Sequence, residues 1–261
     1  MSVQLIGLPW DSSSSYARGP SHGPAIIRTL LFSDASSPYS LSGINANDAI
    51  TGFDFADLPK SGAEARAAIS DRIRAVTTAG KKPLSLGGDH SVTFPILKTL
   101  SETHGPLNIL HIDAHTDLYD TFEGDPYSHA CPFARAIEHN CIDTLVQVGL
   151  RSISPDAKAF GEDHGVVMLE SDAIDEIPYH RLTGPLYVSI DLDGIDPAFA
   201  PGVSHPEPGG LSSREVIGIL KKLPTAPIGA DVVELNPERD QGMITAHLAA
   251  RLVKELAGYM A

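Results

Sequence analysis

Three residues that can bind a metal ion directly follow an apolar run in the stretch LNILHIDAHTDLYD, residues 107–120. They are Asp113, His115 and Asp117, and one residue separates each from the next. Side chains two positions apart on an extended segment point the same way, so this spacing predicts that all three face one side. Carboxylate oxygens and imidazole nitrogens both bind divalent cations, and the stretch is therefore a candidate metal site.

Acids and histidines follow three other apolar runs in the same way. Asp89 and His90 lie in GGDHS (87–91), Asp191 and Asp193 lie in SIDLDGID (189–196), and Glu234 lies in DVVELNP (231–237). Ligands of open α/β sheets bind outside the carboxyl ends of the strands. We therefore expect four strand ends to bring these side chains to one edge of a sheet.

A centre with two cations would account for the charge of this set. Four carboxylates around one pocket would repel each other, and at least one would bind a proton. Two divalent cations would cancel the four charges, and ions roughly 3.5–4 Å apart could share a bridging water and lower its pKa. A set of oxygen and nitrogen ligands without thiolate suits Mn²⁺ better than Zn²⁺, Co²⁺, Ni²⁺ or Fe²⁺. The expected ligands are His90, Asp113, His115, Asp117, Asp191 and Asp193.

Each motif has a simpler structural interpretation when it is taken alone. GGDH is typical of a tight turn with a helix cap, and a single histidine such as His129 is commonly a surface residue. A calcium loop of the DxDG type is excluded, because Ile195 stands where that pattern needs a third acid. Capping does not explain acids at four strand ends, so the combination favours one shared site.

The elements that must position these residues alternate between short apolar runs and helical patterns. Strands that are apolar on both faces and separated by helices predict an α/β fold, with a parallel sheet covered by helices on both sides. Segments 11–24 and 196–210 are expected to be long functional loops. The apolar runs are 3–7, 83–86, 107–112, 145–149, 166–169, 186–192 and 228–235, and the helical patterns are 64–79, 212–222 and 246–257.

The composition is typical of a soluble globular protein, with 42% hydrophobic and 20% charged residues. A length of 261 residues can bury one large core, so residues 1–261 are predicted to form a single domain. The net charge of −14 argues against a nucleic-acid partner or an anionic membrane, which need clustered Lys and Arg. Two cysteines without CxxC spacing suggest neither disulfides nor a thiolate site. The N-terminus lacks a signal-peptide pattern, so we expect a cytoplasmic location by default.

Taken together, GGDHS, DAHTD (113–117), SIDLDGIDPAFAPG (189–202) and DVVELNP resemble the motifs of the ureohydrolases, the arginase/agmatinase family. The resemblance runs along nearly the whole chain. It implies a three-layer α/β/α domain with a central, mostly parallel eight-stranded sheet and two Mn²⁺ per subunit. It also implies hydrolysis of a guanidino group to urea and an amine, by a homotrimer or homohexamer. Some relatives have lost their metals and act as regulators, but all six ligand positions here carry residues able to bind.

The resemblance implies a role for each residue of the site. One metal is assigned to His90, Asp113, Asp117 and Asp191, and the other to Asp113, His115, Asp191 and Asp193. Asp117 also orients the attacking hydroxide and passes a proton to the leaving amine. Glu234 binds the guanidinium group, since a carboxylate can accept two N–H bonds from a planar cation. His129 shuttles protons at the mouth of the pocket, and Arg151 fits a structural role.

The sequence indicates less directly which residues bind the far end of the substrate. Animal-type arginases hold the α-amino acid with an asparagine where this chain has Tyr119 and an aspartate where it has Ser154. A threonine that supports the guanidinium carboxylate aligns with His205. Similarity to plant-type arginases favours L-arginine, with agmatine as the main alternative and guanidinobutyrate or formiminoglutamate as further ones. Arg18 is a candidate partner for a substrate carboxylate.

Overall fold

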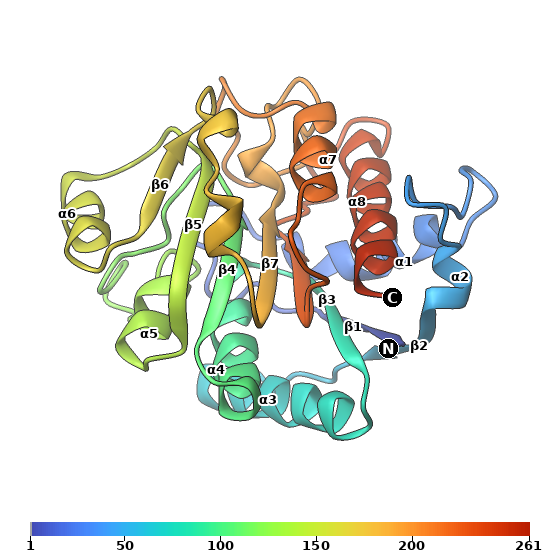
Figure 1. Ribbon diagram of the computed structural model, residues 1–261, viewed down its shortest axis with the longest axis horizontal. Coiled ribbons are helices and arrows are strands. Elements are labelled where there is room, and N and C mark those ends of the chain that lie inside the picture. Colours follow the sequence, from blue (N-terminus) through green and yellow to red (C-terminus); the bar gives the residue numbers. More distant parts are fainter. Residues whose placement is uncertain (1) are drawn as a thin grey trace.

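The computed structural model describes residues 2–261, whose eight strands form one sheet in which all neighbouring strands are parallel (Figure 1). The strand order is β2-β1-β3-β8-β7-β4-β5-β6. This arrangement confirms the predicted α/β class and the eight-stranded sheet. The strands are β1 (Val3–Leu8), β2 (Ile50–Phe55), β3 (Lys82–Gly87), β4 (Leu107–Ile112), β5 (Ile142–Leu150), β6 (Val167–Glu170), β7 (Leu186–Asp191) and β8 (Gly229–Val233).

Helices cover both faces of the sheet and divide the core into two apolar clusters. Helices α1, α2, α7 and α8 contribute to one cluster, and α3, α4, α5 and α6 contribute to the other. Side chains alternate between the two faces along β7, so this strand contributes to both clusters: Val188 belongs to the first and Tyr187 to the second. The helices are α1 (Gly23–Leu31), α2 (Ala46–Ala49), α3 (Gly62–Thr78), α4 (Thr93–His104), α5 (Pro132–Glu138), α6 (Pro155–Asp163), α7 (Ser213–Lys221) and α8 (Ile244–Met260).

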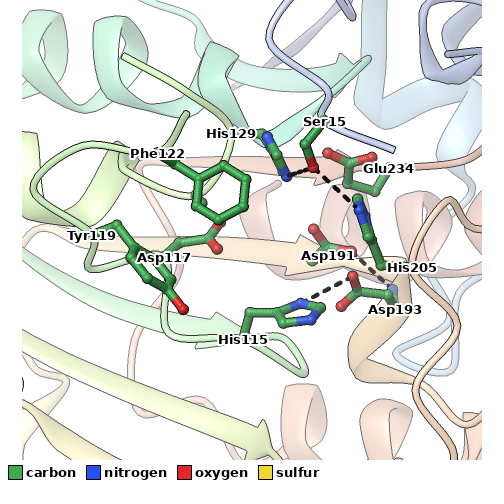
Figure 2. Close-up of a pocket in the computed structure, with 11 residues that line it drawn as sticks. Ser15, His115, Asp117, Tyr119, Phe122, His129, Asp191, Asp193, His205 and Glu234 are labelled. Atoms are coloured by element: carbon green, nitrogen blue, oxygen red, sulfur yellow. Dashed lines mark hydrogen bonds and ion pairs between the residues drawn. The ribbon is translucent and has the colours of Figure 1, made fainter. Parts of the chain in front are cut away.

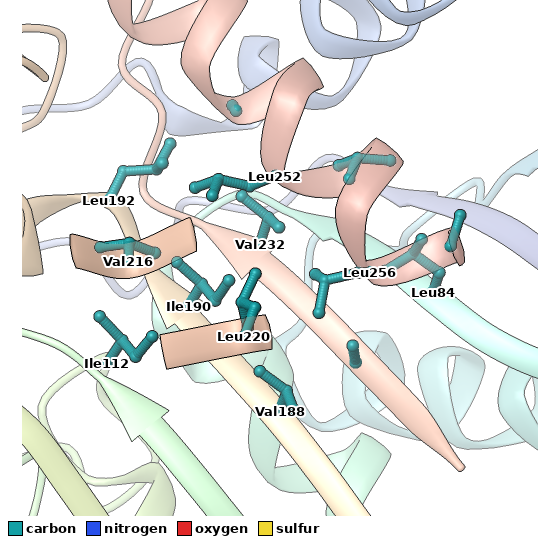
Figure 3. Packing of buried hydrophobic residues seen from close by; sticks show 14 of the residues in the cluster. Leu84, Ile112, Val188, Ile190, Leu192, Val216, Leu220, Val232, Leu252 and Leu256 are labelled. Atoms are coloured by element: carbon teal, nitrogen blue, oxygen red, sulfur yellow. The ribbon is translucent and has the colours of Figure 1, made fainter. Parts of the chain in front are cut away.

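The first cluster packs the central strands against the two C-terminal helices (Figure 3). Val188 and Val232 lie on β7 and β8, Leu220 on α7 and Leu252 on α8, and all four are fully buried. β-Branched residues suit strands that are buried on both faces, which explains their frequency here. The centre of the sheet is therefore a rigid support for the residues that follow it.

The strands that carry the candidate ligands are the four adjacent central ones, β3, β8, β7 and β4. The register pairs Ile112 of β4 with Ile190 of β7, and Asp191 of β7 with Val233 of β8. Asp113, Asp191 and Glu234 consequently leave the sheet side by side. The predicted convergence of these strand ends on one edge is confirmed.

Sequence patterning missed several elements. It did not identify β2, because this edge strand (ITGFDF) is only partly buried and lacks a continuous apolar run. It also overlooked α1, α4, α5 and α6. Segment 11–24, expected to be a loop, contains a 3₁₀ turn at Pro20–His22 and the start of α1 at Gly23, since Pro24 is favourable in a first helical turn. Segment 196–210 contains no helix or strand. Within residues 2–261, no helix is long and apolar enough to cross a membrane.

Gly194 allows the segment after β7 to touch the segment after β4. It ends the 3₁₀ turn Leu192–Gly194, and a Cβ atom there would lie 2.7 Å from the nitrogen and 2.8 Å from the Cα of Asp113. Backbone atoms cannot move aside as a flexible side chain can. A side chain at position 194 would therefore force Asp113 and Asp193 apart.

We expect Gly194→Ala to lower the free energy of unfolding by about 1–3 kcal/mol through overpacking. Gly218→Ala is the matched control, because no atom within 4 Å would meet its Cβ in α7 and alanine favours a helix. The control should be neutral or stabilising by up to about 1 kcal/mol. Urea denaturation followed by circular dichroism measures both, and equal stability of the two variants would contradict the close contact.

Candidate metal centre

Two groups of potential ligand atoms meet at the carboxyl edge of the central strands. His90 Nδ1 lies 2.9 Å from Asp117 Oδ2 and 3.2 Å from the Oδ2 atoms of both Asp113 and Asp191. His115 Nδ1 lies 3.3 Å from Asp113 Oδ1 and 3.2 Å from Asp193 Oδ2. Asp113 thus has one oxygen in each group. The structure brings all six residues predicted as ligands together.

Buried negative charge dominates the electrostatics of this edge. Burial, together with repulsion from Asp193 and Asp113, raises the pKa of Asp191 well above its usual range. Burial and the nearby Asp113 also raise the pKa of Asp193, against the attraction of His115. Burial opposes ionisation of Asp113 too, but the imidazoles around it hold its pKa well below the ordinary value. Without cations, the carboxylates cannot all be ionised at low cost.

The donor set fits divalent cations. His90 Nδ1 is buried and makes no hydrogen bond of acceptable geometry within residues 2–261, although three carboxylate oxygens surround it. A nitrogen in this position is suited to a metal ion held jointly with those oxygens. His90, Asp113, Asp117 and Asp191 could hold one cation, and Asp113, His115 and Asp193 could hold another.

Hydrogen bonds behind His90 orient its ring. His90 Nε2 lies 3.0 Å from Ser189 Oγ, which donates to Asp231 Oδ1 at 2.6 Å. Asp231 also accepts hydrogen bonds from Tyr187 OH at 2.8 Å and Thr93 Oγ1 at 2.7 Å. A histidine whose rear nitrogen donates in this way presents its other nitrogen to a metal. The network therefore turns Nδ1 towards the carboxylates.

Sequence reasoning missed this network, although the pattern contains a signal for it. Ser189 lies two positions before Asp191, and the register pairs Ser189 with Asp231. Both are polar residues inside fully buried strands whose other residues are mostly apolar. Because residues two apart share a face, a polar residue two positions before a predicted ligand faces the same site and is a candidate for supporting another ligand there, as Ser189 does for His90.

Two residues of the site have strained backbones. Asp117 has a φ of 52° and Glu234 a φ of 66°, a left-handed conformation that is uncommon for residues other than glycine. Glu234 Oε1 accepts a hydrogen bond from the backbone N–H of His90 at 2.9 Å. Burial, with repulsion from Asp191 and Asp89, raises the pKa of Glu234 well above its usual range. Such a carboxylate would be stabilised as an anion by a cation in the cavity.

A cavity of about 110 Å³ opens over this edge (Figure 2). Its acids are buried, whereas Tyr119, Phe122 and His205 are only half-buried and form its outer part. Burial and the nearby His129 lower the pKa of His205 to about 4, so its imidazole is neutral at pH 7. The lining residues are Ser15, His115, Asp117, Tyr119, Phe122, His129, Ala130, Asp191, Asp193, His205 and Glu234.

His129 lies between the N-terminal loop and the cavity. Its Nδ1 is 2.7 Å from the carbonyl oxygen of Ser13, which can only accept, so Nδ1 carries a proton. Its Nε2 is 3.4 Å from Ser15 Oγ (Figure 2). The ring of His205 stacks on that of His129 with an interplanar angle of 10°. His129 therefore directs Nε2 towards other residues of the cavity wall.

Two residues considered for substrate recognition lie outside this lining. The guanidinium of Arg18 donates to the carbonyl oxygen of Asp11, and the side chain is 58% exposed. Ser154 caps α6, accepting a hydrogen bond from the backbone N–H of Ala157 at 3.2 Å. Neither is among the residues that line the cavity, so the expected role of Arg18 as a carboxylate partner has no geometric support.

Asp89, next to His90 in the chain, has a structural position. Its carboxylate is fully buried and accepts hydrogen bonds from the backbone N–H groups of Ser13 at 2.9 Å and Ser91 at 3.1 Å. It thereby ties the N-terminal loop to the segment after β3. This contact holds Ser13 and, through it, His129 at the cavity.

Comparisons with known proteins agree with this geometry. The sequence profile of the arginase family matches residues 1–258. "Arginase 1, mitochondrial" of Arabidopsis thaliana is 40% identical over 275 residues, which cover 98% of this chain and 80% of the relative. A guanidinopropionase of Pseudomonas aeruginosa is 38% identical over 274 residues, covering 98% and 86%. The solved structure of an arginase from Medicago truncatula is 39% identical and superposes with a TM-score of 0.93, covering 99% of this chain and 87% of that one.

Arg151 holds the loops around the centre by contacts with backbone oxygens. It donates to the carbonyl groups of Gly149 at 2.8 Å, Asp193 at 2.6 Å, Gly194 at 3.2 Å and Glu207 at 2.5 Å. These contacts support its predicted structural role. They join the segment after β7 to the loop that carries His205.

We expect Arg151→Lys to lower the free energy of unfolding by about 1–3 kcal/mol, because an ammonium group cannot reach all four carbonyls and leaves buried acceptors unpaired. Arg74→Lys is the control, since the half-exposed Arg74 pairs with Glu102 on the surface and should change stability by less than about 1 kcal/mol. Chemical denaturation of both variants measures the difference. Equal losses would contradict the structural role of Arg151.

Proposed function

The chain belongs to the arginase family, and from this premise we propose that it is an arginase, which converts L-arginine and water to L-ornithine and urea. Membership of the family makes it a hydrolase of amidine C–N bonds. The observation that carries the proposal is the convergence at one sheet edge of six side chains able to bind metal, four of which line the same cavity as Glu234.

We propose that the centre holds two Mn²⁺ ions. One would bind His90, Asp113, Asp117 and Asp191, which the first group of neighbouring atoms supports. The other would bind Asp113, His115 and Asp193, which the second group supports, together with Asp191, which the family resemblance adds. When bound, divalent cations of this kind act as Lewis acids and make a water molecule nucleophilic at neutral pH. Ligands that contain only oxygen and nitrogen suit manganese.

Three residues of the cavity then handle the substrate and its protons. The Glu234 carboxylate pairs with the guanidinium group and positions its carbon. The attack of water on that carbon then becomes effectively intramolecular. Asp117 lies at the cavity wall close to His90, where it can take a proton from the attacking water and pass it to the leaving amine. His129 has its proton on Nδ1, so Nε2 is free to accept a proton from the product side and release it to solvent.

The outer part of the cavity favours a substrate end without net charge. Its half-buried residues, among them Tyr119, Phe122 and His205, include no Lys or Arg, and the acids of the lining are the buried ones at the strand ends. The α-amino and α-carboxylate groups of arginine are together neutral and can be met by hydroxyl and imidazole groups. Guanidinopropionate ends in a lone carboxylate, which would lack an opposite charge there. Agmatine ends in a lone ammonium, for which the lining has no exposed acid and Glu207, outside the lining, lies 3.9 Å from His115 Nε2. Guanidinopropionase activity is the second candidate, because a relative of that name is 38% identical.

Several expectations about the whole protein stay predictions. We propose that residues 1–261 act as a single ureohydrolase domain, since all eight strands join one sheet. A homotrimer or homohexamer remains the expected assembly. A cytoplasmic location also remains a prediction, and the Arabidopsis relative is named as mitochondrial.

The substrate is tested by urea release from the manganese-loaded protein, with L-arginine, agmatine and 3-guanidinopropionate offered at equal concentrations. We expect the highest kcat/KM with L-arginine. Preference for either of the other two would contradict the arginase assignment while leaving the guanidino hydrolase in place. Urea from none of them would redirect the test to formamide release from formiminoglutamate.

Glu234→Gln tests how the guanidinium group is held. The amide keeps the shape and an oxygen for the His90 N–H but loses the charge, so we expect kcat/KM to fall roughly 10–100-fold or more, as for a lost charge-assisted hydrogen bond. The manganese content, measured by inductively coupled plasma mass spectrometry, should not change. Asp193→Ala is the contrasting variant and should lose one metal along with nearly all turnover. Normal kcat/KM in Glu234→Gln would exclude Glu234 as the guanidinium partner.

A further inference from the structure

His111 is a buried histidine that lies directly behind the centre and is not one of the six ligands. It is fully buried in β4, two positions before Asp113, and therefore on the same face of the strand. Its Nε2 lies 2.8 Å from Asp113 Oδ2. The ring of Phe133 covers it at a centroid distance of 4.1 Å. The side chain consequently has a defined place and a polar contact to a central ligand.

Gln147 determines which nitrogen of His111 carries the proton. The amide nitrogen of Gln147 lies 2.6 Å from the carbonyl oxygen of Thr116 and 3.0 Å from His111 Nδ1. A flipped amide would place its oxygen against the Thr116 oxygen, so the nitrogen must face this side. Nδ1 of His111 then accepts a hydrogen bond and carries no proton. In a neutral ring the proton is on Nε2, which donates to Asp113.

The same geometry argues against His111 as a seventh ligand. Its ring nitrogen lies within 4.8 Å of the ligand atoms of His90 and Asp113, which is close enough for a shared ion. However, Nε2 can bind a metal only without its proton, and Nδ1 already accepts from Gln147. Neither nitrogen has a lone pair free for a metal while the hydrogen bonds persist.

From these contacts we infer that His111, oriented by Gln147, is a positioning residue that holds Asp113 in a bridging orientation. Asp113 Oδ1 accepts from the backbone N–H of His115 at 2.6 Å, and Oδ2 accepts from His111. Two hydrogen bonds on opposite oxygens prevent rotation of the carboxylate. They keep Oδ2 beside His90 and Oδ1 beside His115. Without His111, Asp113 can turn and bind one cation at the expense of the other.

This inference rests on the proposed two-metal centre, and its test uses Mn²⁺ alone, without substrate. His111→Leu removes the donor, whereas His111→Gln places an amide N–H within reach of Asp113. Gln147→Leu leaves His111 in place but removes the contact that fixes its proton on Nε2. Calorimetric titration gives the number and affinity of bound ions, and electron paramagnetic resonance reports magnetic coupling between two bridged Mn²⁺ ions.

We expect His111→Leu to weaken the second Mn²⁺ roughly 10–100-fold, as for other lost contacts to metal ligands, and to reduce the coupled signal. His111→Gln should restore the affinity for the second Mn²⁺ and the coupled signal to near the wild-type values. Gln147→Leu should give values between those of the wild type and His111→Leu. Ile73→Ala, a fully buried change in α3, is the control: it should destabilise the fold without altering Mn²⁺ affinity or coupling.

Each other outcome overturns part of the scheme. Wild-type affinity and coupling in His111→Leu would refute the positioning role alone. Complete loss of one ion in both His111 variants would make His111 a ligand instead. A wild-type chain that binds no pair of Mn²⁺ ions would overturn the proposed centre and this role with it.

Discussion

Negative charge buried at the ends of four neighbouring strands is the constraint that the rest of the structure must satisfy. Asp191 and Asp193 are each 3% exposed, and burial together with other carboxylates raises their pKa values. Removing an uncompensated charge from water costs several kcal/mol per ion. Divalent cations compensate several carboxylates at once, which neutral neighbours cannot do. The charge pattern therefore fits a metal centre, in agreement with the groups of neighbouring ligand atoms at this edge.

The fold meets this constraint by leaving the side chains of the site little freedom. Asp117 and Glu234 occupy left-handed conformations, which cost about 1–3 kcal/mol each and persist only where the surroundings enforce them. For Glu234, the enforcing contact is its backbone N–H, which donates to the carbonyl of Gly88 at 2.8 Å. The ring of His90 is fixed from behind by Ser189. The apolar strands, the strained corners and the buried hydrogen bonds thus act together on the same few side chains.

The sequence was sufficient to predict the features that depend on strand periodicity. It was not sufficient to predict strands that are only partly buried or hydrogen bonds between buried polar groups. The central strands and the convergence of Asp113, Asp191 and Glu234 followed from continuous apolar runs that end in acids. The edge strand β2 did not, because ITGFDF is half exposed. His111 lies within the apolar run 107–112, and spacing alone cannot show that Gln147, 36 residues away, is its partner. The far end of the cavity depends on three loops whose paths no periodicity encodes.

This division between strands and loops bears on substrate choice. The predicted ligands and the residues that orient them come from β3, β4, β7 and β8 or the residues just after them, whereas Ser15, Tyr119 and His205 reach the cavity from loops. Loops tolerate substitution because few packed contacts depend on them, but a buried ligand network does not. Substrate preference can therefore change without altering the metal centre. If substrate contacts change independently of the metal centre, relatives with different substrates can be about equally similar to this chain. An arginase is 40% identical and a guanidinopropionase 38% identical, as expected. Overall identity is accordingly a weak guide to the substrate, and the neutral groups around the outer cavity are the stronger argument for arginine.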